Sequence, residues 1–68
     1  MSFAENLKNL RTQEGLTQPE LAKALGVSNG MISFWENGVY EPIASNIIKI
    51  ARYFHVTTDE LLDFDLDE

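Results

Sequence analysis

Residue types that catalyse reactions or bind metal ions are scarce in this sequence. It contains no cysteine and a single histidine, His55, so it offers no thiol nucleophile and no cluster of soft metal ligands. Asp63, Asp65 and Asp67 resemble the start of a calcium-binding loop, but the glycine and the glutamate that such a loop needs further on are missing. We therefore expect no enzymatic activity, no cofactor and no metal site, and we interpret His55 as a helix-end residue.

Recognition through hydrogen-bonding side chains is the chemistry that remains, and the side chains of interest lie in residues 17–37. Two short helices are expected there, joined by a tight turn that contains Gly26. Ala22 is small enough to lie where the two helices approach each other, and Ile32 and Trp35 are expected to face the core. The outer side of the second helix then carries two polar residues and one aromatic residue, which are Asn29, Ser33 and Phe34.

The elements that would position these residues are all helices. Capping boxes, in which Ser or Thr is followed three residues later by Glu, begin three of them. These boxes are Ser2 with Glu5, Thr17 with Glu20, and Thr57 with Glu60. The first box begins a helix over about residues 3–14. A Ser28 cap begins a helix over about residues 28–36, and a 3.6-residue apolar spacing predicts another from Ala44 to Phe54.

The net charge of −6 is unevenly distributed. Five acidic and five basic side chains lie in residues 1–58, and the excess of acidic residues follows them. We expect one domain, residues 1–62, followed by an acidic C-terminal tail, residues 63–68. The basic composition typical of nucleic-acid binders is missing. No apolar run approaches the roughly 18 residues that a membrane span requires, so we expect a cytoplasmic protein with no membrane contact.

Short motifs follow one another in a specific order between Leu7 and Leu62. They are Leu10-Arg11, Gly15-Leu16-Thr17-Gln18, Glu20-Leu21-Ala22, Leu25-Gly26-Val27-Ser28, Ile32-Ser33, Trp35-Glu36-Asn37-Gly38, Glu41-Pro42, Lys49-Ile50-Ala51 and Val56-Thr57-Thr58-Asp59-Glu60-Leu61-Leu62. Their order and spacing resemble the lambda-repressor-like (Cro/CI, Xre-type) helix-turn-helix family. The resemblance implies an all-α, compact five-helix bundle, usually dimeric, whose third helix enters the DNA major groove. It implies a transcriptional regulator, with repression as the expected outcome.

The resemblance also implies which residues read bases. Asn29 is the sharpest candidate, because a side-chain amide can pair bidentately with adenine in the major groove. Phe34 could press against a thymine methyl group. Gly30 supplies no side chain and weakens its helix by about 1 kcal/mol relative to alanine. The implied base-reading positions are Ser28, Asn29, Gly30, Ser33 and Phe34.

Phosphate contacts are implied on both sides of these positions. Gln18 would contact a phosphate at the start of the helix that Thr17 caps, where exposed amides favour anions. Lys23 is either a further phosphate contact or a solvated lysine. The amides of Asn37 and Gly38 would hold a phosphate on the far side of the groove.

Structural roles are implied for a second group of residues. Arg11 is expected to pair with Glu36 and so to tie the first helix to the third. Lys49 and Arg52 are expected to be solvated. Apolar residues near the C-terminus are interpreted as a homodimer interface. They are Leu61, Leu62, Phe64 and Leu66.

The same surface also supports a second interpretation. Phe34, Val39 and Tyr40 stand where the family often has basic residues or, at the first position, glutamine. Fewer cations predict modest DNA affinity with a shallow salt dependence. The alternative is a protein-interaction module or an antitoxin-like partner protein that keeps the fold but binds DNA weakly.

Overall fold

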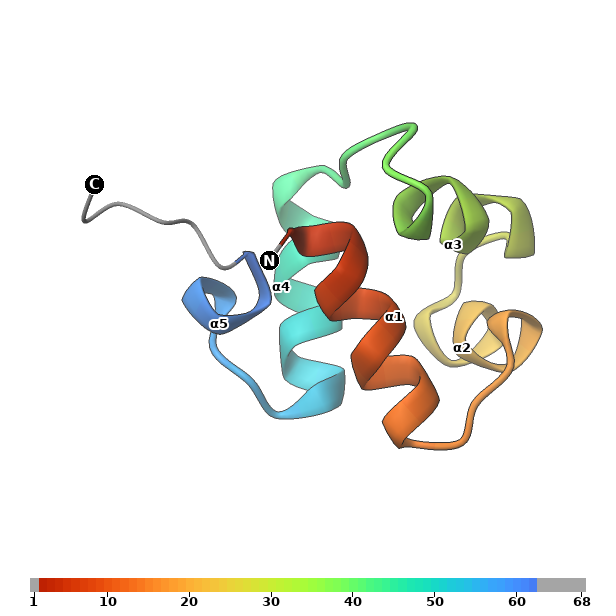
Figure 1. Ribbon diagram of the computed structural model, residues 1–68, viewed down its shortest axis with the longest axis horizontal. Helices are drawn as coiled ribbons and strands as arrows, with labels where there is room; N and C mark the ends of the chain where they lie inside the picture. Colours follow the sequence, from red (N-terminus) through yellow and green to blue (C-terminus); the bar gives the residue numbers. More distant parts are fainter. Residues whose placement is uncertain (1, 63–68) are drawn as a thin grey trace.

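The computed structural model describes residues 2–62 of the chain. Every regular element in that part is a helix, and the helices are joined by short loops (Figure 1). They are α1 (Phe3–Gln13), α2 (Gln18–Leu25), α3 (Asn29–Glu36), α4 (Ala44–Phe54) and α5 (Thr58–Leu62). The predicted all-α, five-helix fold is confirmed, and the helices begin and end close to the predicted residues.

Side-chain caps begin four of the helices, as predicted. The boxes at α1, α2 and α5 are complete, because each hydroxyl accepts from a backbone N–H and each glutamate accepts from the cap residue. At α3, Ser28 Oγ accepts from the Met31 N–H at 3.1 Å. Helix α4 begins after Ile43 without a side-chain cap. These local bonds satisfy amides that have no partner within the helix.

Helices α1 to α4 all end in the same way. A backbone N–H reaches back to the carbonyl five residues earlier, from Leu16 to Arg11, Val27 to Ala22, Val39 to Phe34 and Val56 to Ala51. This Schellman geometry requires a left-handed residue just before the donor. Glycine fills that position in three cases, and His55, with a φ of 59°, fills it after α4. The helix-end role predicted for His55 is confirmed.

A single core joins the five helices. Helix α1 packs against α3 and α5, while α4 packs against α5 and α2. Figure 1 shows α2 and α3 at one end of the molecule and α5 at the other, with α1 and α4 between them. The predicted core residues Ile32, Trp35 and Ala22 are buried. Within residues 2–62 the buried hydrophobic residues are Leu7, Leu21, Ala22, Leu25, Ile32, Trp35, Ile50, Ala51 and Leu61.

None of the helices in residues 2–62 combines the length and the apolar character needed to cross a membrane. In the same residues, no three histidine, aspartate or glutamate side chains come together as metal ligands.

Candidate nucleic-acid interface

The outer face of α3 carries the residues predicted to read bases. Asn29 and Ser33 follow one another at four-residue spacing, Gly30 and Phe34 form the neighbouring row, and Ser28 caps the helix directly before them. Ser33 is half-buried and the other four are exposed. The opposite side of α3 is buried in the core. The fold therefore brings the predicted base-reading residues together on one accessible surface.

Hydrogen bonds on this face leave Asn29 free. Ser28 accepts from the Met31 N–H as the cap of α3, and Ser33 Oγ accepts from Asn37 Nδ2 at 3.3 Å. Among the described residues, no hydrogen bond engages the Asn29 side chain. Its amide therefore presents both a donor and an acceptor to a ligand, as bidentate recognition of adenine requires.

A buried carboxylate fixes α3 relative to α1 and α2. Arg11 Nε and Nη2 donate to the two carboxylate oxygens of Glu36 at 2.6 and 3.0 Å, and Arg11 Nη1 donates to the Leu16 carbonyl at 2.8 Å. Gln18 Nε2 donates to Glu36 Oε1 at 3.1 Å. The hydrogen bond to Glu36 raises the pKa of Arg11 above its usual value. The predicted ion pair is confirmed, and it joins α1 to α3.

The structure modifies the expectations for the phosphate contacts. The Gln18 side chain is partly engaged by Glu36, although the second hydrogen of its amide remains to donate. The backbone N–H groups of Asn37 and Gly38 donate to the carbonyls of Ser33 and Trp35 at 3.0 and 3.3 Å. Both N–H groups are therefore already used to end α3, and the phosphate contact of these two amides stays a prediction that the structure does not support.

The remaining predicted residues divide between surface and core. Lys23 is exposed on α2, and Leu62 is half-buried at the end of α5. Leu61 is fully buried inside the molecule, so the structure assigns it to the core and not to the predicted dimer interface. The predictions for Phe64 and Leu66 lie outside the described residues.

Two polar contacts were not foreseen from the sequence. Lys49, expected to be solvated, donates from Nζ to the Leu25 carbonyl at 3.1 Å and so supports the C-terminal end of α2. Asn6 Nδ2 donates to the Leu61 carbonyl at 2.9 Å and ties α1 to α5. Both contacts join residues that lie far apart in the sequence, and no local signal marks them.

Gly30 has no structural reason to be glycine. It lies within α3, and a methyl group added to it would meet no atom within 4 Å. Gly30→Ala should therefore stabilise the domain by about 1 kcal/mol, which raises Tm by roughly 4–8 °C in a domain of this size. Thermal unfolding followed by circular dichroism measures the change. Gly26→Ala is the matched control. It should lower Tm, because Gly26 has a φ of +73° that alanine adopts only with strain. An unchanged Tm for Gly30→Ala would contradict the argument.

A known family model matches this arrangement. Residues 7–61 match the HTH_3 family, described as helix-turn-helix. The chain belongs to this helix-turn-helix family. The HTH_3 chain is 47% identical over 62 residues to the HTH-type transcriptional activator BcrR of Enterococcus faecalis, a match that covers 91% of this chain and 30% of BcrR. An uncharacterized HTH-type transcriptional regulator of Archaeoglobus fulgidus is 40% identical over 62 residues, covering 91% of this chain and 89% of that protein.

Solved structures agree with the HTH_3 assignment. The P22 c2 repressor, determined in complex with a synthetic operator, matches with a TM-score of 0.88 and 31% identity. The match covers 96% of this chain and 98% of that chain. The resemblance to lambda-repressor-like, Cro/CI-type domains is therefore confirmed in fold and in family. A DNA-binding transcriptional regulator is the function class that these comparisons support.

Proposed function

We propose that this chain binds a specific double-stranded DNA operator as a homodimer and regulates transcription there, with the outer face of α3 in the major groove. The observation that carries the proposal is the exposed, unengaged Asn29 amide in the first turn of α3, beside Ser33 and Phe34 on one surface. The likeness to a repressor solved with its operator supports the same placement of α3. The chain acts by binding and not by catalysis. Repression is the proposed outcome, because occupying an operator requires no further contact.

Uncharged contacts dominate the proposed interface. No lysine or arginine occurs from residue 24 to residue 48, and that stretch contains Glu36 and Glu41. Lys23 and Gln18 on α2 are the nearest candidates for phosphate contacts. Because few counterions are released, the affinity should fall only slowly as salt rises. Specificity then rests on base-edge hydrogen bonds and apolar contacts.

Two copies of the chain would read a pseudo-palindromic operator. Helix-turn-helix dimers contact half-sites spaced by about one helical turn of DNA or a multiple of it. Leu62, half-buried at the end of α5, is the described residue that supports a contact there. The proposed interface also includes Phe64 and Leu66, which lie outside the described residues.

Asn29→Ala is expected to reduce sequence discrimination. Losing a bidentate contact to adenine should cost roughly 1–3 kcal/mol at one base position per half-site, so the variant should accept other bases there. The measurement is selection of binding sites from random duplex DNA, followed by affinities for the selected site and for single-base variants of it.

Lys23→Ala is the matched control on α2. It should weaken binding to all sequences similarly and reduce the salt slope by about 1, because a phosphate contact carries no sequence information. If Asn29→Ala leaves discrimination intact, the proposed role of Asn29 is wrong.

A protein partner is the second candidate function. The shortage of cations near α3 favours it, as do the exposed apolar side chains beside that helix, among them Val39, Tyr40 and Ile43. Random-DNA selection at low salt separates the two functions. Recovery of a DNA motif supports the sequence-specific regulator, and failure to recover one supports a protein-interaction module that keeps the fold.

A further inference from the structure

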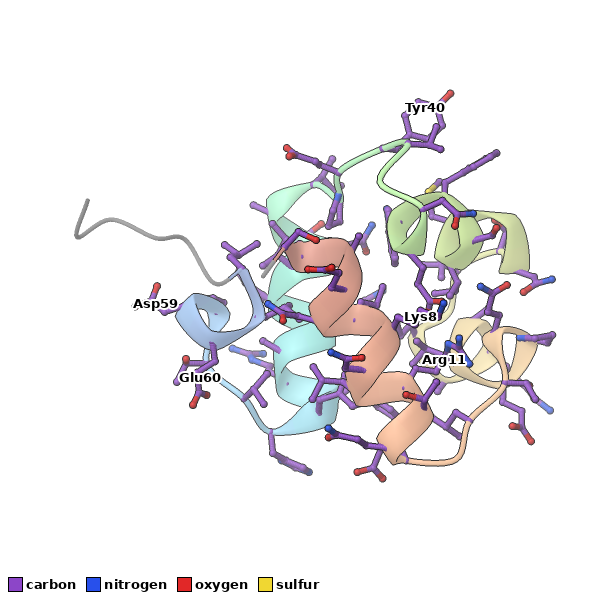
Figure 2. All side chains as sticks on the ribbon, viewed as in Figure 1. Lys8, Arg11, Tyr40, Asp59 and Glu60 are labelled. Atoms are coloured by element: carbon purple, nitrogen blue, oxygen red, sulfur yellow. The ribbon has the colours of Figure 1, made fainter. Side chains whose placement is uncertain are left out.

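Two exposed aromatic residues meet at the C-terminal end of α3. The rings of Phe34 and Tyr40 lie edge to face, with centroids 5.2 Å apart and planes at 89°. Phe34 is 43% exposed and Tyr40 is 58% exposed. Figure 2 shows Tyr40 projecting outward from the loop between α3 and α4. The pair therefore forms a small aromatic surface that continues the outer face of α3.

The end of α3 determines where Tyr40 lies. Gly38 has a φ of 73°, and the Val39 N–H donates to the Phe34 carbonyl at 2.9 Å. This hydrogen bond returns the chain over the last turn of the helix, so that Tyr40 comes back to the ring of Phe34. An edge-to-face contact then restricts the orientation of the otherwise exposed Phe34 ring.

The chain segment that carries the pair offers no positive charge to a phosphate. From residue 24 to residue 48 the chain has no lysine or arginine, and Glu41 follows Tyr40 directly. An aromatic ring at the edge of the major groove instead matches the C5-methyl group of thymine, which is the apolar group that base pairs present there. Two rings in contact bury such a methyl group more completely than one mobile ring would.

We propose, resting on the proposed DNA-reading function, that Phe34 and Tyr40 together form a specificity contact for a thymine 5-methyl group. Phe34 contacts the methyl group. Tyr40 is a positioning residue that holds the Phe34 ring in place.

Deoxyuridine substitution tests the proposal, because it removes the methyl group and leaves base pairing intact. Starting from a duplex selected with the full chain, each thymine is replaced in turn and the affinity is measured. At one thymine per half-site, the substitution should lower the affinity of the wild type about fourfold. That ratio corresponds to the free energy gained by burying one methyl group. Tyr40→Ala should bring this thymine-to-uracil ratio to about 1, and Tyr40→Phe should keep it near fourfold.

Val39→Ala controls for loss of an exposed apolar side chain in the same loop, and it should leave the ratio unchanged. Circular dichroism verifies that each variant is folded. A ratio of 1 at every thymine in the wild type, or a full ratio in Tyr40→Ala, would overturn the inference while the selected motif still supports the proposed function. If selection returns no motif, the proposed function and this inference fail together.

Discussion

Replacing Arg11 with methionine should remove a large share of the stability of this domain. The Glu36 side chain is only 3% exposed, and its carboxylate receives two hydrogen bonds from Arg11 and one from Gln18. Without Arg11 the buried carboxylate keeps a single neutral partner. Breaking a buried pair in this way costs about 3–5 kcal/mol, out of the roughly 5–15 kcal/mol that stabilises a typical protein.

Urea unfolding measures the loss, and two further variants define its cause. Arg11→Met combined with Glu36→Leu should be more stable than Arg11→Met alone, because no unpaired charge is left buried. Arg11→Lys keeps the charge but cannot form the two-pronged contact, so it should lie between the wild type and Arg11→Met. A free energy of unfolding for Arg11→Met within 1 kcal/mol of the wild type (about the size of an exposed ion pair) would contradict a buried pair.

The pH dependence of this pair follows from the direction of the Arg11 shift. The pKa of Arg11 is raised by its hydrogen bond to Glu36. A raised pKa contributes stability that is complete below the usual arginine pKa and is lost only as the pH rises above it. The contribution of Arg11 should therefore be constant from neutral to moderately alkaline pH.

Replacing Trp35 with alanine should be comparably damaging. Trp35 is 1% exposed and is the largest fully buried side chain in residues 2–62. Truncating a buried tryptophan removes its apolar contacts and leaves a cavity, at a cost of about 3–5 kcal/mol. Because Trp35 holds the inner side of α3, the variant should lose both thermal stability and an ordered DNA-reading surface. Thermal unfolding reports the first effect, and the affinity for a duplex selected with the wild type reports the second.

Phe34→Ala is the internal control for Trp35→Ala. It removes an aromatic side chain from the adjacent position of the same helix, but that side chain is 43% exposed. Its effect on stability should be much smaller, since the removed surface is already partly solvated. Equal losses of stability in the two variants would contradict the assignment of inner and outer faces to α3.

The fold could be predicted largely because its helix boundaries are local. Capping boxes and left-handed helix ends involve residues a few positions apart, so Ser2 with Glu5, or Gly26 before Val27, can be recognised without any tertiary information. The outer face of α3 follows from the same helical spacing. The Arg11–Glu36 pair was different, because its prediction came from family resemblance and not from the residues alone.

Other parts of the site could not be predicted because they depend on how distant elements meet. Lys49 finds its acceptor at Leu25, and Asn6 finds its acceptor at Leu61, only once the helices have packed. Apolar residues near a chain end predict an interface that includes Leu61, but packing of α5 buries this residue within the molecule. The N–H groups of Asn37 and Gly38 donate to carbonyls at the end of α3, a use that the family resemblance alone does not indicate.

The absence of cations from residue 24 to residue 48 bears on how the proposed regulator would be distributed in a cell. Binding to arbitrary DNA depends almost wholly on phosphate neutralisation, and a genome offers an enormous excess of such competing sites. A protein whose DNA-reading surface has few cations would spend little of its time bound to such non-specific sites. A larger fraction of the molecules stays free to sample operators, so occupancy should follow copy number closely even when the absolute affinity is modest.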